Sequence, residues 1–229
     1  MTRTEQAEPR SFESRSDTAA VEEVLRANDS SLHALYNGFA TDESGGGGDV
    51  NTSNERMDLS EWTEFCKSLM LLDKDFTTKD VTLSFIWSRM WIVDEHRKAS
   101  QKKVSGLDFE DFLEAIIRVA VQKAWPTSDT MEAAGFEADD HFQLPRYLEH
   151  LRDNDRKAYD TLLVESAVPW YGKPSATSAE CLRCLLKCVM YEVKTVRPSD
   201  NPSKISLKDV KVFRADAKNA FRADAKQRR

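Results

Sequence analysis

The chain has 229 residues, 40% hydrophobic and 31% charged, a balance typical of a folded globular protein. No segment has the roughly 18 uncharged apolar residues that a membrane span needs, and the polar N-terminus lacks the apolar run of a secretion signal. We therefore expect a cytoplasmic protein without a membrane span. Residues 203–229 carry a net charge of +6 against −6 for the whole chain, so an acidic body precedes a basic tail.

The first half of the chain is predicted to form helices separated by polar loops. The chain has only eight glycines, four of them in one run, which leaves little material for the turns of an all-β fold and predicts an all-α protein. Residues 1–18 are expected to form a disordered arm. Apolar residues at helical spacing predict a helix over about 18–40, a loop rich in Gly, Asp and Asn over 41–56, and a second helix from Ser60 as its N-cap.

Two further helices follow in this half. Thr77 and Asp80 have the spacing of a capping box, which predicts a helix start there. That helix is apolar nearly all round as far as Val93, so we expect it in the centre of the core. The next apolar stripe runs from Phe109 to Ala120, and we expect its helix to end at Trp125-Pro126.

The second half begins after an expected linker over 125–140. Residues 141–165 fit either one long helix or two short ones that meet near Asp155. Thr177 and Glu180 predict another capping box, which opens a helix with an apolar arc ending before Pro198. The last helix has apolar residues along one side, and it contains the hexapeptide Phe-Arg-Ala-Asp-Ala-Lys twice, at 213–218 and 221–226.

The segment Gly106–Leu113 looks like the end of an EF-hand loop. Leu107 would be the apolar residue at loop position 8, and Asp111 the acidic residue at position 12. The segment Arg56–Trp62 supplies a matching partner, with Leu59 opposite Leu107. We therefore expect an EF-hand-like pair of helix-loop-helix units with a short β-bridge over residues 19–124. A second helical segment over 141–229 would contain a further degenerate half at Ile205.

The ligand chemistry of these loops argues against calcium. Calcium needs oxygen ligands at positions 1, 3 and 5 and a bidentate carboxylate at position 12. In the second loop these positions hold Ser100, Lys102, Val104 and Asp111, and in the first they hold Thr52, Asn54, Arg56 and Thr63. We therefore predict no metal and no cofactor. The rival hypothesis is a calcium-responsive adaptor with a non-standard loop, built on Asp200 and Asp209 or on Asp42, Glu43 and Asp49.

The hydrophobic spacing over residues 32–120 resembles a known group of proteins. The residues that carry the resemblance are Met57, Trp62, Phe65-Cys66-Lys67, Thr77, Asp80-Val81, Phe85, Leu107, Phe109, Phe112, Ala115 and Val119-Ala120. They are similar to the degenerate EF-hand module of the tubulin-polymerization-promoting protein family and of related axonemal proteins of flagellated protists. The resemblance implies a structural, microtubule-associated protein of a flagellar or ciliary axoneme. Such a protein would bind tubulin or neighbouring axonemal proteins without calcium.

The chain departs from that pattern in three places. These are the Gly-rich insertion, the lysine-bearing second loop, and a C-terminal half with no counterpart in the family. The alternative is an ordinary all-α core whose helix ends have EF-hand spacing by accident.

The basic tail supplies the candidate partner-binding residues. Seven cations recur every three or four positions: Lys208, Lys211, Arg214, Lys218, Arg222, Lys226 and Arg229. On a helix they share one face, opposite an apolar side, and that face suits acidic tubulin or an anionic membrane. Nucleic acid is the least favoured partner, because the body is acidic and has no recognisable binding motif. The alternative is an ordinary solvated face of a terminal helix.

The remaining candidates for chemistry are weak. Cys181, Cys184 and Cys188 lie on one side of a helix, so a zinc or redox site is conceivable, but no fourth ligand is near in sequence and buried free thiols are common. No nucleophile sits beside a base in a readable motif. We therefore expect a non-enzymatic protein with no catalytic residues.

Overall fold

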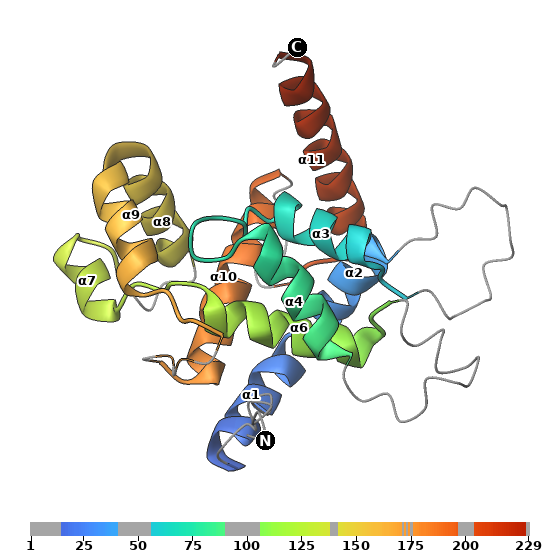
Figure 1. The fold of residues 1–229 in the computed structure, drawn as a ribbon, viewed down its shortest axis with the longest axis horizontal. Coiled ribbons are helices and arrows are strands. Elements are labelled where there is room, and N and C mark those ends of the chain that lie inside the picture. The colour runs from blue at the N-terminus through green and yellow to red at the C-terminus, as the bar shows by residue number, and fades with distance from the viewer. Residues whose placement is uncertain are drawn as a thin grey trace, which may run out of the picture.

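The computed structural model describes residues 15–40, 56–89, 106–137, 142–170, 172, 174, 176–196 and 204–227. All regular secondary structure in these ranges is α-helical, which confirms the prediction of an all-α protein (Figure 1). The helices are α1 (Arg15–Ala27), α2 (Asp29–Phe39), α3 (Leu59–Ser68), α4 (Thr78–Ser88), α6 (Phe109–Gln122), α7 (Ser128–Ala133), α8 (Gln143–Asn154), α9 (Arg156–Glu165), α10 (Ser178–Val196) and α11 (Leu207–Gln227). None of these described helices is long and apolar enough to cross a membrane. Helix α1 begins inside the arm expected over 1–18; residues 1–14 lie outside the described ranges.

Local capping chemistry sets where several helices begin. The Asp58 carboxylate accepts a hydrogen bond from the Glu61 N–H at 2.8 Å, and the Glu61 carboxylate accepts one from the Asp58 N–H at 2.9 Å. These bonds satisfy donors that a helix start leaves without partners. The predicted N-cap Ser60 is therefore wrong, because Asp58 caps the helix and Ser60 lies within its first turn.

The same device opens four more helices. The pairs are Thr77 with Asp80, Asp108 with Asp111, Thr177 with Glu180, and Ser206 with Asp209. The first and third of these were predicted from sequence and are confirmed. In every pair the carboxylate lies three residues after the N-cap residue and accepts a hydrogen bond from the backbone N–H of that residue.

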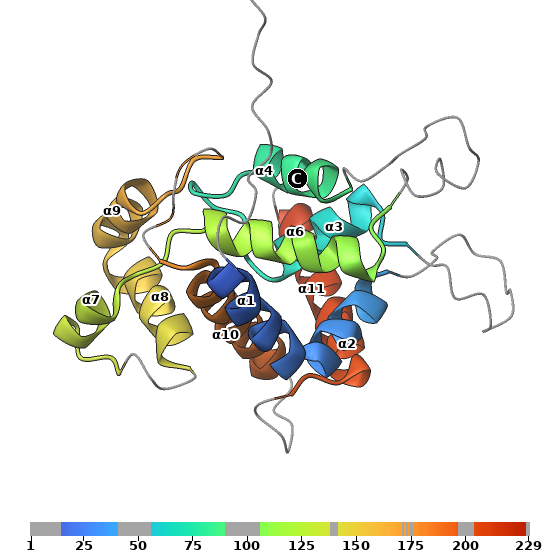
Figure 2. The ribbon, with the colours of Figure 1, turned by 90° about the horizontal axis from the view of Figure 1, so that it is seen from below.

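One hydrophobic cluster joins both ends of the chain. At its centre Trp62 stacks on Phe65, with 5.2 Å between the ring centroids, and Phe112 meets both rings edge-on. Helix α10 packs against α6 and α1, and α11 packs against α2 (Figures 1 and 2). Buried residues of α10 and α11 thus belong to the same core as the helices of the predicted EF-hand-like domain.

A smaller cluster is built from α7, α8 and α9, at the left of Figure 1. Helix α7 lies within the stretch 125–140 that was expected to be a linker, and its Met131 is buried in this cluster. Residues 141–165 form two short helices rather than one, since α8 ends at Asn154 and Asp155 caps α9 by accepting the Ala158 N–H at 3.0 Å.

A buried ion pair ties the two clusters together. Asp75 has a fully buried side chain; it accepts the Lys123 ammonium at 2.8 Å and the Ala124 N–H at 2.8 Å. Two residues earlier, Asp73 accepts the hydroxyl of Tyr159, from α9, at 2.8 Å. The loop after α3 is thereby held against the end of α6 and against α9.

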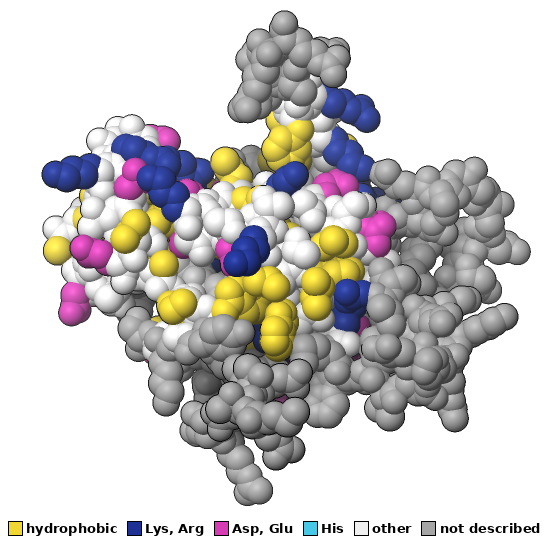
Figure 3. All heavy atoms as spheres, viewed as in Figure 1, with side chains coloured by type: hydrophobic (Ala, Val, Ile, Leu, Met, Phe, Trp, Pro, Cys, Tyr) yellow, Lys and Arg dark blue, Asp and Glu magenta, His cyan; other side chains and the backbone are white. Residues whose placement is uncertain are grey.

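Helix α4 is less central than its composition predicts. Val81 and Phe85 are buried, but Ile86 is 45% exposed, and hydrophobic side chains gather on the surface in this region (Figure 3). The expectation of a helix buried on all sides is therefore wrong for the described part of α4. Residues 90–93 of the predicted helix lie outside the described ranges.

Candidate functional site

The two segments that were expected to pair do pair, but in a different register. Met57 and Leu107 exchange backbone hydrogen bonds in both directions, at 2.9 and 2.7 Å, and both side chains are fully buried. The predicted contact of Leu59 with Leu107 is wrong. Leu59 is the first residue of α3 and is 37% exposed, because the cap at Asp58 has already turned the chain into the helix.

In this register a different residue occupies position 12 at the end of the first loop. If Met57 is loop position 8, position 12 is Glu61 rather than Thr63, and the arrangement matches Leu107 with Asp111. Both carboxylates are used as helix caps, since Glu61 accepts the Asp58 N–H and Asp111 accepts the Asp108 N–H at 3.2 Å. The two segments are therefore equivalent in local chemistry.

A guanidinium lies where the two segments meet. Arg56 donates to the Asp108 carboxylate at 2.9 Å and to the Gly106 carbonyl at 3.2 Å, and it lies 3.8 Å from the Asp111 carboxylate. The two segments approach so closely here that a Cβ on Gly106 would stand 2.7 Å from the Arg56 Cβ. Burial, helped by the neighbouring Asp108 carboxylate, raises the pKa of Asp111 to about 6, although the hydrogen bond from the Asp108 N–H and the charge of Arg56 act in the opposite direction.

Sequence reasoning missed this role of Arg56. The residue was treated as a cation in a ligand position, and only its neighbours across the bridge show that it serves two carboxylates. Among the described residues no group of three or more His, Cys, Asp or Glu side chains could hold a metal ion. Of the residues considered for calcium, Asp209 caps α11 and lies 3.7 Å from the Lys194 ammonium. The others, Asp42, Glu43, Asp49 and Asp200, lie outside the described ranges.

The three thiols of α10 divide between the two hydrophobic clusters. Cys181 is buried in the main core, whereas Cys184 and Cys188 pack against the smaller cluster of α7, α8 and α9. Burial raises the pKa of Cys184 and of Cys188, which disfavours the thiolate form needed for metal binding or nucleophilic attack. This environment is typical of thiols that fill a core.

The basic helix α11 is anchored to the body by its first half. Arg214 donates from Nε and NH2 to the two carboxylate oxygens of Glu64, at 2.7 and 2.9 Å, and from NH1 to the Gly38 carbonyl at 3.1 Å. Its guanidinium also lies over the ring of Phe39, 5.3 Å from the centroid. Phe213 beside it is buried in the core. We call this arrangement the Glu64 seat.

The structure places the seven predicted partner-binding cations in different environments. Lys208, Lys211 and Arg222 are exposed on α11. Arg214 is buried in the Glu64 seat, so the expectation that it faces a partner is wrong; no pattern in the sequence separates it from its neighbours. Lys218 is partly exposed and lies 3.5 Å from the Glu64 carboxylate. The Lys226 side chain and Arg229 lie outside what the structure describes.

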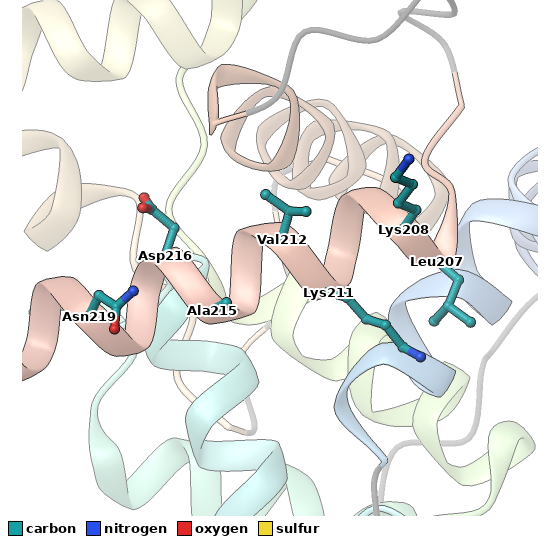
Figure 4. Close-up of a pocket in the computed structure, with 7 residues that line it drawn as sticks. All are labelled: Leu207, Lys208, Lys211, Val212, Ala215, Asp216 and Asn219. Atoms are coloured by element: carbon teal, nitrogen blue, oxygen red, sulfur yellow. The ribbon is translucent and has the colours of Figure 1, made fainter.

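The outward side of α11 carries a shallow hollow. Its lining comes entirely from this helix: Leu207, Lys208, Lys211, Val212, Ala215, Asp216 and Asn219 (Figure 4). Leu207 and Val212, which line it, are 38% and 40% exposed. Further along, α11 rises out of the body, with basic side chains on one side of it and hydrophobic ones on the other (Figures 1 and 3). The exposed surface of α11 thus combines apolar area with cations.

Comparisons with known proteins name no relative. The chain matches no protein-family model, no curated protein and no solved structure.

Proposed function

We propose that this chain is a non-enzymatic scaffold protein of the microtubule cytoskeleton that binds an acidic protein partner through α11. The single observation that supports this most is α11 itself, a helix that leaves the body with Lys208, Lys211 and Arg222 exposed beside apolar residues. A cationic surface with apolar area fits an acidic protein, and the surface of tubulin is such a partner.

We further propose that α2 with α3, and α4 with α6, form a degenerate EF-hand-like pair that needs no calcium. The bridge of Met57 with Leu107 and the matched caps at Glu61 and Asp111 support this view. Arg56 places a positive charge beside Asp108 and Asp111, as a bound metal ion would. The proposed location is the axoneme of a flagellum or cilium, next to tubulin or neighbouring axonemal proteins.

Co-sedimentation with microtubules tests the proposal. The wild-type protein should bind at low ionic strength and weaken as salt rises, because exposed charges are screened. The double variant Lys208→Glu, Lys211→Glu should bind more weakly. Its matched control, Lys79→Glu with Lys157→Glu, makes the same change of charge on exposed residues of α4 and α9 and should bind as wild type does.

Two further measurements complete the test. A tagged copy should stay on the axoneme when flagellated cells are extracted with detergent; release into the supernatant, together with failure to co-sediment, would refute the proposal. Calorimetric titration should show no calcium binding in the range of about 10⁻⁷ to 10⁻⁵ M that sensors use. Binding in that range would favour the calcium-responsive adaptor instead.

A further inference from the structure

Helix α11 presents one hexapeptide in two environments. The first copy, 213–218, lies against the body, and the second, 221–226, begins eight residues later, which is about 12 Å further along the helix axis. Phe213 is 3% exposed, but its counterpart Phe221 is 48% exposed. Arg214 is likewise buried, whereas Arg222 is exposed.

The first copy shows what this hexapeptide binds. Its phenylalanine fills an apolar site, and its arginine grips both oxygens of one carboxylate while the lysine four residues later approaches the same carboxylate. In the first copy the body therefore accepts the phenylalanine in its apolar core and the adjacent arginine on a carboxylate. Arginine is well suited to this pairing because its planar fork matches the two carboxylate oxygens.

The second copy has the same chemistry without an acceptor. Neither Phe221 nor Arg222 makes a hydrogen bond, ion pair or ring contact with the part of the chain that the structure describes. Eight residues make two full helical turns plus about 80°, so the second copy faces about 80° away from the first around the helix axis. An exposed phenylalanine beside an exposed arginine is the composition of an interface anchor.

We propose that Phe221 and Arg222 form a docking anchor for an acidic protein. Phe221 enters an apolar hollow of the partner, and Arg222 pairs with a carboxylate at the edge of that hollow, as Phe213 and Arg214 do within this chain. This proposal rests on the proposed function and adds to it the chemistry of the partner's acceptor.

Charge favours a protein with surface carboxylates as the occupant. Residues 219–229 contain four basic residues and one aspartate, so this part of the sequence carries +3. A second copy of this chain is a poorer occupant, because its own Arg214 already fills the Glu64 seat. A membrane surface is less favoured because binding to it scales with buried apolar area, and the neighbouring residues Ala217, Ala220 and Ala223 add little to that of Phe221.

The experiment compares two double variants of the full-length chain by co-sedimentation with microtubules. Phe221→Ala with Arg222→Gln removes the anchor. The control, Val164→Ala with Lys157→Gln, removes an exposed apolar side chain and an exposed charge from α9. Both should fold as wild type does, which thermal unfolding checks. We expect the anchor variant to bind about tenfold or more weakly, as for loss of an anchoring aromatic, and the control to bind normally.

Each of the other outcomes overturns the inference, and they differ in whether the proposed function also fails. Normal microtubule binding by the anchor variant overturns the anchor and leaves the proposed function standing. Failure of the wild-type protein to bind overturns both. If wild type binds phosphatidylserine vesicles or forms dimers in sedimentation equilibrium, and the anchor variant loses that binding but not microtubule binding, then the occupant is a membrane or a second copy and the inference is wrong.

Discussion

Arg214 and Arg222 occupy the same place in two identical hexapeptides, so replacing each by alanine measures the Glu64 seat against an internal control. Arg214→Ala removes two hydrogen bonds to Glu64 and one to the Gly38 carbonyl, at 2.7, 2.9 and 3.1 Å. At about 1 kcal/mol net for each bond, the loss is about 3 kcal/mol. Lys218 stays 3.5 Å from the Glu64 carboxylate and leaves it partly paired, which argues against a larger effect.

The expected result for Arg222→Ala is a change within about 0.5 kcal/mol, as for an ordinary surface site. Urea unfolding followed by tryptophan fluorescence is a suitable assay, because Trp62 is fully buried in the main core. Glu64→Gln, alone and combined with Arg214→Ala, completes a double-mutant cycle that isolates the pair. Equal midpoints for Arg214→Ala and Arg222→Ala would show that the Glu64 seat contributes nothing to stability.

Three other perturbations follow from the described contacts. Gly38→Ala should cost about 1–3 kcal/mol in the same urea assay, because the new Cβ would stand 2.4 and 2.9 Å from side-chain atoms of Val210; an unchanged midpoint would contradict the close approach of α2 and α11. Asp75→Ala should lower the free energy of unfolding by about 3 kcal/mol, because it leaves the Lys123 ammonium buried without a carboxylate. Adding Lys123→Met should recover part of that loss. A double variant less stable than Asp75→Ala alone would disprove this. Burial raises the pKa of Asp111 from 3.8 to about 6, so the folded state binds the proton more tightly and stability should fall as pH rises from about 4 to 6. Asp111→Asn should flatten that part of the unfolding curve against pH; identical curves for the two proteins would exclude Asp111 as the cause.

The helices were predictable where their causes are local. The capping boxes at Thr77 and Thr177 depend on residues three positions apart, so the sequence is enough to find them. The apolar arc of α10 likewise showed that this helix has a buried side. It could not show that the buried side meets α6 and α1, because that contact depends on residues from distant parts of the chain.

The register of the bridge shows how a local detail can mislead. Met57 and Leu59 are both apolar and stand two positions apart, so in an extended segment they point to the same side. Hydrophobicity therefore cannot choose between them as the partner of Leu107. The choice is made by Asp58, whose carboxylate caps α3 and commits Leu59 to the helix, so Met57 is the residue that pairs with Leu107.

The two hexapeptides of α11 mark the limit of sequence reasoning more sharply. Their residues and spacing are the same and both lie in α11, yet Arg214 is buried and Arg222 is exposed. The difference arises because Glu64 and the Gly38 carbonyl come from α3 and α2, which reach the first copy but not the second. A pattern of basic residues therefore predicts a cationic face, but the body decides which of its cations remain available to a partner.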